Sequence, residues 1–185
     1  MRMAAVLLCL LLAGCGRSPF HMTDISGALP RLDFRMTRAN DGKQVTGTDY
    51  RGKVVALYFG YTNCPDVCPT TLADLTKMLE RVKSPDVRVL FVSVDPARDS
   101  PAALAHYVAA FSPQMDGLRG GDEALAQMAR RYRVAYSVDK GPPYEVMHSN
   151  AVFFFDRDGR ARLVTTDTGN SAAMAEDVTR LLEQQ

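Results

Sequence analysis

The cysteines Cys64 and Cys68 flank the tripeptide Pro65-Asp66-Val67 in the middle of the chain, just after an apolar run. If this segment begins a helix, the i to i+4 spacing brings both sulfur atoms to one face. The N–H groups at a helix start also stabilise a thiolate and lower its pKa below about 8.5. Two thiolates can bind a soft metal ion or close into a disulfide, and the spacing leaves both chemistries open. A purely structural disulfide is disfavoured, because so short a loop gains little chain-entropy stabilisation.

The residues on either side of this pair predict a buried strand followed by a helix. Residues 54–59, VVALYF, form an apolar run of strand length with a β-branched start. Pro69 suits the first turn of a helix. Apolar residues then recur along one helical face: Leu72, Leu75, Leu79 and Val82. The pair therefore falls at the carboxyl end of a strand, where α/β folds present reactive groups.

The rest of the chain alternates strands and helices in the same way. Apolar runs predict further strands over residues 87–94 and 151–155. The turn signal at residues 156–159, DRDG, leads the second of these back into a strand over residues 161–165. Capping residues open further helices at Ser100-Pro101, at Asp122, and at Asn170 or Ser171. Upstream, short strands over residues 32–37 and 44–48 flank the turn signal Asn40-Asp41-Gly42. This order predicts one α/β domain over residues 31–185, a thioredoxin-like sandwich with an added N-terminal β-hairpin, although element order alone leaves several topologies open.

The start of the chain predicts where the protein works. Arg2 precedes an apolar run, residues 4–12, that is too short to span a bilayer. The run ends in Leu12-Ala13-Gly14-Cys15, which resembles a bacterial lipobox. We therefore predict a lipoprotein signal peptide over residues 1–14, a lipid on Cys15 and a flexible membrane tether over residues 15–30. The alternative is an ordinary signal peptide with Cys15 merely nearby.

A lipid anchor places the domain in the bacterial cell envelope, in the periplasm or another extracytoplasmic space. Thiols there tend to be oxidised unless a reductant acts on them. Composition agrees with a soluble globular domain, since 46% of the 185 residues are hydrophobic and 23% are charged. A formal net charge of +1 gives no support to a nucleic-acid partner, which normally needs a dense basic face.

Three blocks of sequence resemble one known family. Residues 58–69, YFGYTNCPDVCP, closely resemble the signature of the Sco/SenC family of copper chaperones. Residues 93–101, SVDPARDSP, resemble its second hallmark stretch, and residues 144–158 resemble its third, with His148 ahead of an apolar strand. The blocks occur in the family's order, and the likeness runs from about Leu32 to near the C-terminus. This pattern is far more specific than the cysteine spacing alone.

The resemblance implies a thioredoxin-like fold and copper binding through Cys64, Cys68 and His148. Two thiolates and an imidazole favour Cu(I), and with another ligand they can also hold Cu(II). Zinc could bind the same set, so the metal's identity depends on the resemblance. The resemblance also implies delivery of copper to the dinuclear copper site of cytochrome c oxidase subunit II. Such delivery requires reduced cysteines, and therefore an upstream thiol reductant and a copper donor.

Other residues with ligand chemistry are weaker candidates. His21 falls in the predicted tether and His106 on a helix surface, so ordinary surface roles are favoured for both. Asp66 is predicted to be a solvent-facing carboxylate or a helix-start residue. The alternative is that it lies near the metal, where it tunes the charge of the site or contacts the recipient. Met147 precedes His148, and because adjacent strand residues point to opposite faces, we predict that it packs in the core.

The second and third blocks raise two further points. Asp95, Arg98 and Asp99 are predicted to form an ion network that braces a loop, rather than to act in catalysis. The third block departs from the family pattern at Met147, where family members often carry Asp, and at Asn150, where a small or apolar residue is more common. Neither departure removes a ligand, but both can alter metal affinity, redox poise or the choice of recipient.

Two enzyme functions compete with the chaperone interpretation. In a thiol-disulfide oxidoreductase, Cys64 would attack a disulfide and Cys68 would resolve the mixed disulfide. The three intervening residues weigh against it, because thioredoxin-type redox motifs have two. So does the absence of a proline between Tyr144 and Asp156, where such enzymes carry a cis-Pro. A thiol peroxidase is less favoured still, because the expected Pro and Thr do not precede Cys64 at the right spacing.

Overall fold

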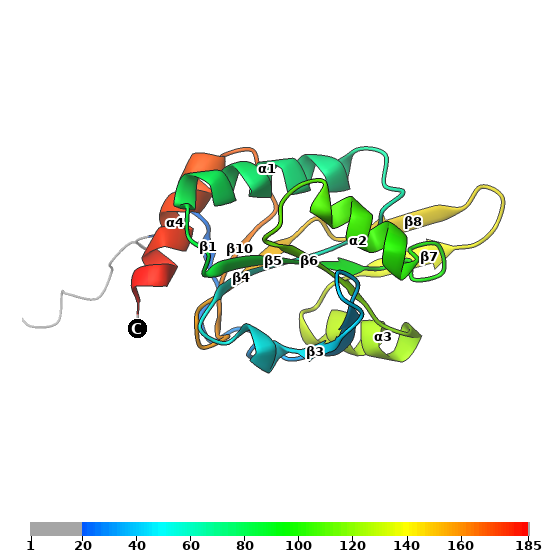
Figure 1. The fold of residues 1–185 in the computed structure, drawn as a ribbon, viewed down its shortest axis with the longest axis horizontal. Coiled ribbons are helices and arrows are strands. Elements are labelled where there is room, and N and C mark those ends of the chain that lie inside the picture. The colour runs from blue at the N-terminus through cyan, green and yellow to red at the C-terminus, as the bar shows by residue number, and fades with distance from the viewer. Residues whose placement is uncertain (1–19, 185) are drawn as a thin grey trace, which may run out of the picture.

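A computed structural model describes residues 20–184 (Figure 1). Its main sheet has eight strands in the order β1-β10-β9-β4-β5-β6-β2-β3. These strands are β1 Thr23–Asp24, β2 Arg35–Arg38, β3 Gln44–Thr46, β4 Val54–Gly60, β5 Val87–Ser93, β6 Met115–Arg119, β9 Val152–Phe155 and β10 Ala161–Thr165. A separate two-stranded sheet consists of β7 Tyr136–Asp139 and β8 Glu145–His148. The helices are α1 Val67–Val82, α2 Pro101–Ala109, α3 Asp122–Arg131 and α4 Ser171–Glu183, with a short 3-10 helix over Gly47–Tyr50.

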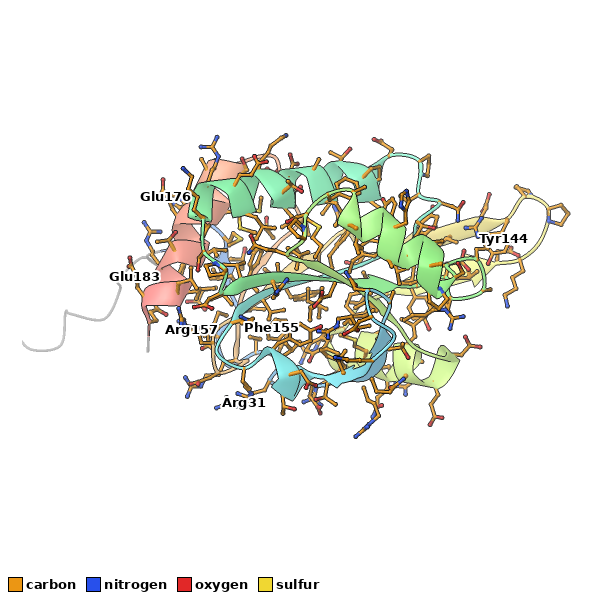
Figure 2. The ribbon with its side chains drawn as sticks, in the orientation of Figure 1. Arg31, Tyr144, Phe155, Arg157, Glu176 and Glu183 are labelled. Carbon is orange, nitrogen blue, oxygen red and sulfur yellow. The ribbon has the colours of Figure 1, made fainter. Side chains whose placement is uncertain are left out.

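The centre of the main sheet is the core of the domain. Strand β4 is buried along its whole length, and it pairs in parallel with β5 and antiparallel with β9. Helices α1 and α2 lie on one side of the sheet and α3 on the other (Figure 1). Phe155 of β9 lies in this core, whereas Glu176 and Glu183 lie on the outer face of α4 (Figure 2). Apolar strands covered on both faces are what the continuous hydrophobic runs indicate, so the α/β sandwich is confirmed.

The helix starts follow the predicted capping residues with one exception. Ser100 accepts a hydrogen bond from the Ala103 N–H at the start of α2, and Asn170 accepts one from the Ala173 N–H at the start of α4. Helix α3 differs, because Gly121 occupies the N-cap position and Asp122 is the first helical residue. The carboxylate of Asp122 therefore lies in the first turn, where the helix dipole favours negative charge, rather than in the predicted cap.

The N-terminal segment differs from the tether predicted over residues 15–30. Strand β1 pairs antiparallel with β10, and Met22 is buried. The fully buried carboxylate of Asp177 on α4 accepts hydrogen bonds from the N–H groups of His21, at 2.8 Å, and Met22, at 2.7 Å. Residues 20–30 are thus part of the folded domain.

The predicted signal peptide and the predicted lipidation site Cys15 lie outside the described residues. Within residues 20–184, none of the helices is long and apolar enough to cross a membrane.

Candidate metal site

The two cysteines lie where the central strand passes into the first helix. Strand β4 ends at Gly60, and α1 begins at Val67, so that Cys68 belongs to the first helical turn. The Cys68 side chain is fully buried, whereas Cys64 in the preceding loop is partly exposed. The backbone N–H of Cys68 points at the Cys64 Sγ atom, at 3.3 Å. Cys64 is thus not on the helix that the i to i+4 argument assumes, and the hydrogen bond from the Cys68 N–H brings its sulfur atom to the start of α1 instead.

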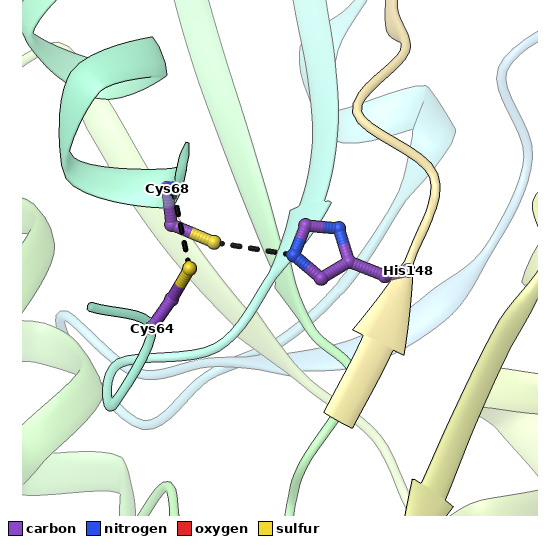
Figure 3. Close-up of side chains that lie close together, drawn as sticks. All are labelled: Cys64, Cys68 and His148. Carbon is purple, nitrogen blue, oxygen red and sulfur yellow. Dashed lines mark hydrogen bonds between the residues drawn. The ribbon is translucent and has the colours of Figure 1, made fainter. Parts of the chain in front are cut away.

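His148 completes the group, although it lies 80 positions after Cys68 in the sequence. It is the last residue of β8, and its Nε2 atom lies 3.3 Å from the Cys68 Sγ atom (Figure 3). Its Nδ1 atom lies 2.9 Å from the Ser149 carbonyl oxygen, which can only accept, so Nδ1 carries the proton. The lone pair of Nε2 therefore faces the thiols. A backbone carbonyl on the second nitrogen is the usual support of a metal-binding histidine.

The three side chains offer a compact ligand set. One ligand atom from each of Cys64, Cys68 and His148 lies within 4.8 Å of the other two. Within residues 20–184, this is the one such group of at least three His, Cys, Asp or Glu side chains. Two sulfur atoms and one neutral imidazole suit a soft ion, with Cu(I) and Zn²⁺ as the chemically matched candidates.

The two thiols differ in acidity. Burial opposes ionisation of Cys64, but the N–H groups of Cys68 and Asp66 point at its sulfur and lower its pKa below the ordinary value. Burial raises the pKa of Cys68 to about 12. Burial also lowers the pKa of His148, against the opposing effect of the Ser149 carbonyl. In the metal-free protein at neutral pH, Cys64 is thus the reactive thiol, Cys68 is protonated and the imidazole is neutral.

This asymmetry predicts the order of alkylation. In the reduced, metal-free protein at about pH 7.5, iodoacetamide is expected to modify Cys64 well before Cys68, because only a thiolate is an effective nucleophile. As pH rises, the Cys64 rate should level off below the ordinary cysteine pKa, while the Cys68 rate keeps increasing to far higher pH. Peptide mass spectrometry over time measures both rates. Equal rates at neutral pH would contradict the asymmetry.

Tyrosines surround the group on its buried side. The Tyr58 hydroxyl donates a hydrogen bond to the Cys68 Sγ atom, at 3.7 Å. The rings of Tyr61 and Tyr58 meet the His148 ring edge-on, with centroids 5.8 and 6.0 Å apart. These contacts fix the plane of the imidazole. Sequence reasoning missed them, although both tyrosines belong to the first recognised block.

The weaker candidates fall outside the ligand group. His21 pairs with Glu176, with 2.9 Å between Nε2 and Oε2, and His106 is exposed on α2. Asp66 is exposed immediately before α1, and only its backbone N–H interacts with a ligand residue. Met147 contradicts the prediction that it packs in the core, because it is 70% exposed. The strand alternation was correct, but β8 belongs to a hairpin whose outer face meets solvent rather than the core.

The predicted ion network divides into two parts. Asp95 forms an ion pair with Arg98, as expected. Asp99 instead accepts hydrogen bonds from the hydroxyl groups of Thr62 and Ser93, each at 2.6 Å. Both carboxylates are almost fully buried. Asp99 therefore connects the loop after β5 to residues 61–66, the cysteine loop, whereas Asp95 bonds to Arg98 and to the Tyr144 hydroxyl.

Comparison with known proteins gives one consistent match. The family model described as SCO1/SenC matches residues 25–183. The protein SCO2 homolog, mitochondrial, of Bos taurus is 42% identical over 138 residues, which are 71% of this chain and 50% of the bovine protein. The chain thus spans about half the length of the curated relatives it matches.

Two solved structures extend the comparison to the fold. Arabidopsis thaliana ScoI with copper bound superposes with a TM-score of 0.77 at 32% identity, covering 84% of this chain and 99% of that one. A SCO1/SenC family lipoprotein from Bacillus anthracis superposes with a TM-score of 0.72 at 25% identity, covering 84% and 96%. These neighbours confirm the thioredoxin-like assignment.

Proposed function

The chain belongs to the SCO1/SenC family, and from this membership we propose that it is a copper chaperone. It binds one copper ion through Cys64, Cys68 and His148 and delivers it to the dinuclear copper site of a cytochrome c oxidase subunit II. The observation that carries the proposal is the convergence of two sulfur atoms and one imidazole nitrogen within 4.8 Å of one another. The ScoI structure with copper bound supports copper over zinc as the cargo.

The geometry suits a cargo that must leave again. Cys64 is partly exposed and loses its proton easily, whereas Cys68 is buried against Tyr58. A recipient thiolate can approach the copper ion from the Cys64 side and form a sulfur–copper bond as the Cys64–copper bond breaks. A second recipient ligand then displaces Cys68, which takes up a proton, while Cys64 is left as a thiolate. The bond from His148 to copper breaks last, and copper keeps its oxidation state throughout.

Copper delivery of this kind requires further components. Both cysteines must be reduced, so an extracytoplasmic thiol reductant and a copper donor act upstream. A lipid on Cys15 would hold the domain at the membrane that contains the oxidase. The Bacillus anthracis relative is a lipoprotein, which supports this anchoring. A mature-chain mass shifted by a lipid on Cys15, and lost in Cys15→Ser, is the direct check.

A transfer experiment tests the proposed function. Reduced protein loaded with Cu(I) is mixed with the copper-free, reduced soluble domain of cytochrome c oxidase subunit II, in the presence of a chelator that traps free copper. After separation, copper is expected on the recipient. The His106→Ala variant is the matched control, because this exposed histidine lies outside the site, and it should transfer normally. Copper that remains on the donor, or that passes only to the chelator, would contradict delivery.

One observation favours a second function. Cys64 is a partly exposed thiol whose pKa backbone N–H groups lower below the ordinary value, and it lies beside Cys68, a buried thiol whose pKa is raised. Thiol-disulfide exchange uses such a pair of unequal thiols. The Cys64 thiolate would attack a recipient disulfide, and Cys68 would then displace the recipient, which leaves with two thiols while a Cys64–Cys68 disulfide forms. Turnover of the oxidised recipient by copper-free protein, with no copper transfer, would favour this function over the chaperone.

A further inference from the structure

We infer that the loop between β5 and α2, residues 94–100, is a positioning element that holds His148 at the correct separation from the two cysteines. We call it the brace loop. It has one arm on the cysteine loop and a second arm on the β7–β8 hairpin, which carries His148. The inference rests on the proposed function, because it concerns how the copper ligands are brought together.

The first arm is Asp99. Its carboxylate is fully buried and accepts hydrogen bonds from the Thr62 hydroxyl, at 2.6 Å, and from the Thr62 N–H, at 3.2 Å. Thr62 lies two residues before Cys64 in the sequence. A buried carboxylate with several donors is costly to disturb, because an unpaired charge would remain in the interior. This arm therefore fixes the cysteine loop to the brace loop.

The second arm is the pair Asp95 and Arg98. The Tyr144 hydroxyl donates a hydrogen bond to Asp95 Oδ1, at 2.8 Å. The Arg98 guanidinium forms an ion pair with Asp95 and lies over the Tyr144 ring, 3.8 Å from its centroid. Tyr144 immediately precedes β8 at the outer end of the hairpin (Figure 2). This arm therefore holds the residue that leads directly into β8, the strand that ends in His148.

The second arm matters because the hairpin is a sheet of its own. Within residues 20–184, strands β7 and β8 pair only with each other. A cavity of about 590 Å³ separates the hairpin from α3, with Leu125 and Ala129 on one wall and Tyr136 and Val138 on the other. The cavity interrupts the packing on this side, so the second arm adds to the contacts of Tyr136 and Val146 with the core in fixing the position of the hairpin.

The strand itself transmits the position of Tyr144 to His148. Residues two apart in a strand point to the same face, so Tyr144, Val146 and His148 all face the body of the domain. These three residues are partly buried, whereas Glu145 and Met147 between them are exposed, which agrees with this alternation. Arg98 also lies 5.7 Å from the centroid of Tyr61, whose ring meets the His148 ring edge-on. Arg98 therefore lies between Tyr144, which leads into β8, and Tyr61, which precedes Cys64.

The brace loop is itself anchored to the main sheet. Arg119, at the end of β6, donates hydrogen bonds to the carbonyl oxygens of Asp99, at 3.0 Å, and Pro96, at 2.7 Å. The loop can therefore transmit position from the rigid sheet to both halves of the site. Loss of the second arm alone should free the imidazole, while the first arm still holds the two cysteines in place.

The test compares Arg98→Ala and Tyr144→Phe with the wild-type protein. Tyr144→Phe removes only the hydrogen bond to Asp95 and is the milder change. Tyr136→Phe is the matched control, because it removes a hydroxyl from the same hairpin that makes no bond to the brace loop. Thermal unfolding and circular dichroism establish that each variant is folded.

The first readout is amide hydrogen exchange in the copper-free protein. Exchange in the β7–β8 hairpin is expected to be about tenfold faster or more in Arg98→Ala, smaller in Tyr144→Phe and unchanged in Tyr136→Phe. Exchange in β4 and α1 should stay the same. Unchanged hairpin exchange in Arg98→Ala would overturn the inference, and this result does not depend on whether the protein binds copper.

The second readout is a double-mutant cycle on copper affinity. Arg98→Ala is expected to weaken copper binding about 10–100-fold in the wild-type background, as is usual for groups that orient a ligand. In the His148→Ala background the same change should have less than about a twofold effect, because the ligand that Arg98 positions is gone. An equal loss in both backgrounds would overturn positioning through His148. A wild-type protein that binds no copper would instead overturn the proposed function, and hydrogen exchange would still decide on the brace loop.

Discussion

Replacing Cys64 or Cys68 by alanine is expected to weaken copper binding by more than about 100-fold, because each change removes a ligand rather than one of its supports. His148→Ala should weaken Cu(II) binding more than Cu(I) binding, since the two remaining thiolates still suit Cu(I). Anaerobic titration of the reduced protein against a competing chelator of known affinity measures all three variants. Wild-type protein should bind one copper ion per chain.

The remaining histidines provide the controls for this prediction. His21 pairs with Glu176 on the surface, and His106 is exposed on α2. Alanine at either position should leave copper affinity within about twofold of the wild-type value. Full copper binding in His148→Ala, with loss in His21→Ala or His106→Ala, would assign the nitrogen ligand elsewhere and refute the ligand set proposed here.

Gly60→Ala is expected to damage the site without touching a ligand. A methyl group at Gly60 would lie 2.8 Å from the Cys68 Sγ atom and 2.7 Å from the Phe91 ring, closer than side-chain contacts allow. Overpacking in a buried core typically costs about 1–3 kcal/mol. The methyl group also displaces the Cys68 sulfur atom from its place 3.3 Å from His148 Nε2, so copper affinity should fall by about tenfold or more as well. Thermal unfolding and copper titration measure the two losses.

Gly117→Ala is the matched comparison for that change. Its added methyl group would lie 2.7 Å from the Leu104 Cγ atom, between β6 and α2 and away from the copper ligands. This variant should lose stability in the same range while it keeps wild-type copper affinity. If both glycine variants lost copper affinity equally, the effect would belong to general destabilisation and not to the position of Cys68.

The central elements could be predicted because their own residues determine them. The runs of β4, β5 and β9 are apolar and of strand length, and a turn signal leads into β10. Ser100 and Asn170 cap the helices that follow β5 and β10. Strand β6 was missed, since Asp116 and Gly117 interrupt its apolar pattern. The Asp116 carboxylate is tolerated in the sheet because the Tyr50 hydroxyl donates to it at 2.8 Å. A contact between residues so far apart in the sequence leaves no local signal.

The sequence predicts the two cysteines of the candidate site from local spacing, but it does not predict the histidine in this way. The cysteine pair follows from local spacing at a strand-to-helix junction. His148 lies 80 positions from Cys68, and only the resemblance to the Sco/SenC family indicated it. The β7–β8 hairpin that brings it back was not predicted, because residues 136–148 include a proline pair and many polar residues. The exposed Met147 is a consequence of the same missed hairpin.

The N-terminal boundary shows how tertiary contacts override composition. Residues 20–30 are rich in turn-forming residues, which is why they resemble a tether. Their backbone N–H groups nevertheless meet the buried Asp177 carboxylate, and β1 completes one edge of the sheet. The folded domain therefore begins earlier than the periodic apolar pattern indicates.

Copper K-edge X-ray absorption of the reduced, Cu(I)-loaded protein tests the ligand set most directly. We expect two sulfur neighbours and one nitrogen neighbour per copper in the wild-type protein. The nitrogen contribution should disappear in His148→Ala, and one sulfur contribution should disappear in Cys64→Ala or Cys68→Ala. A copper ion with no sulfur neighbours, or a nitrogen neighbour that persists in His148→Ala, would contradict the site formed by Cys64, Cys68 and His148.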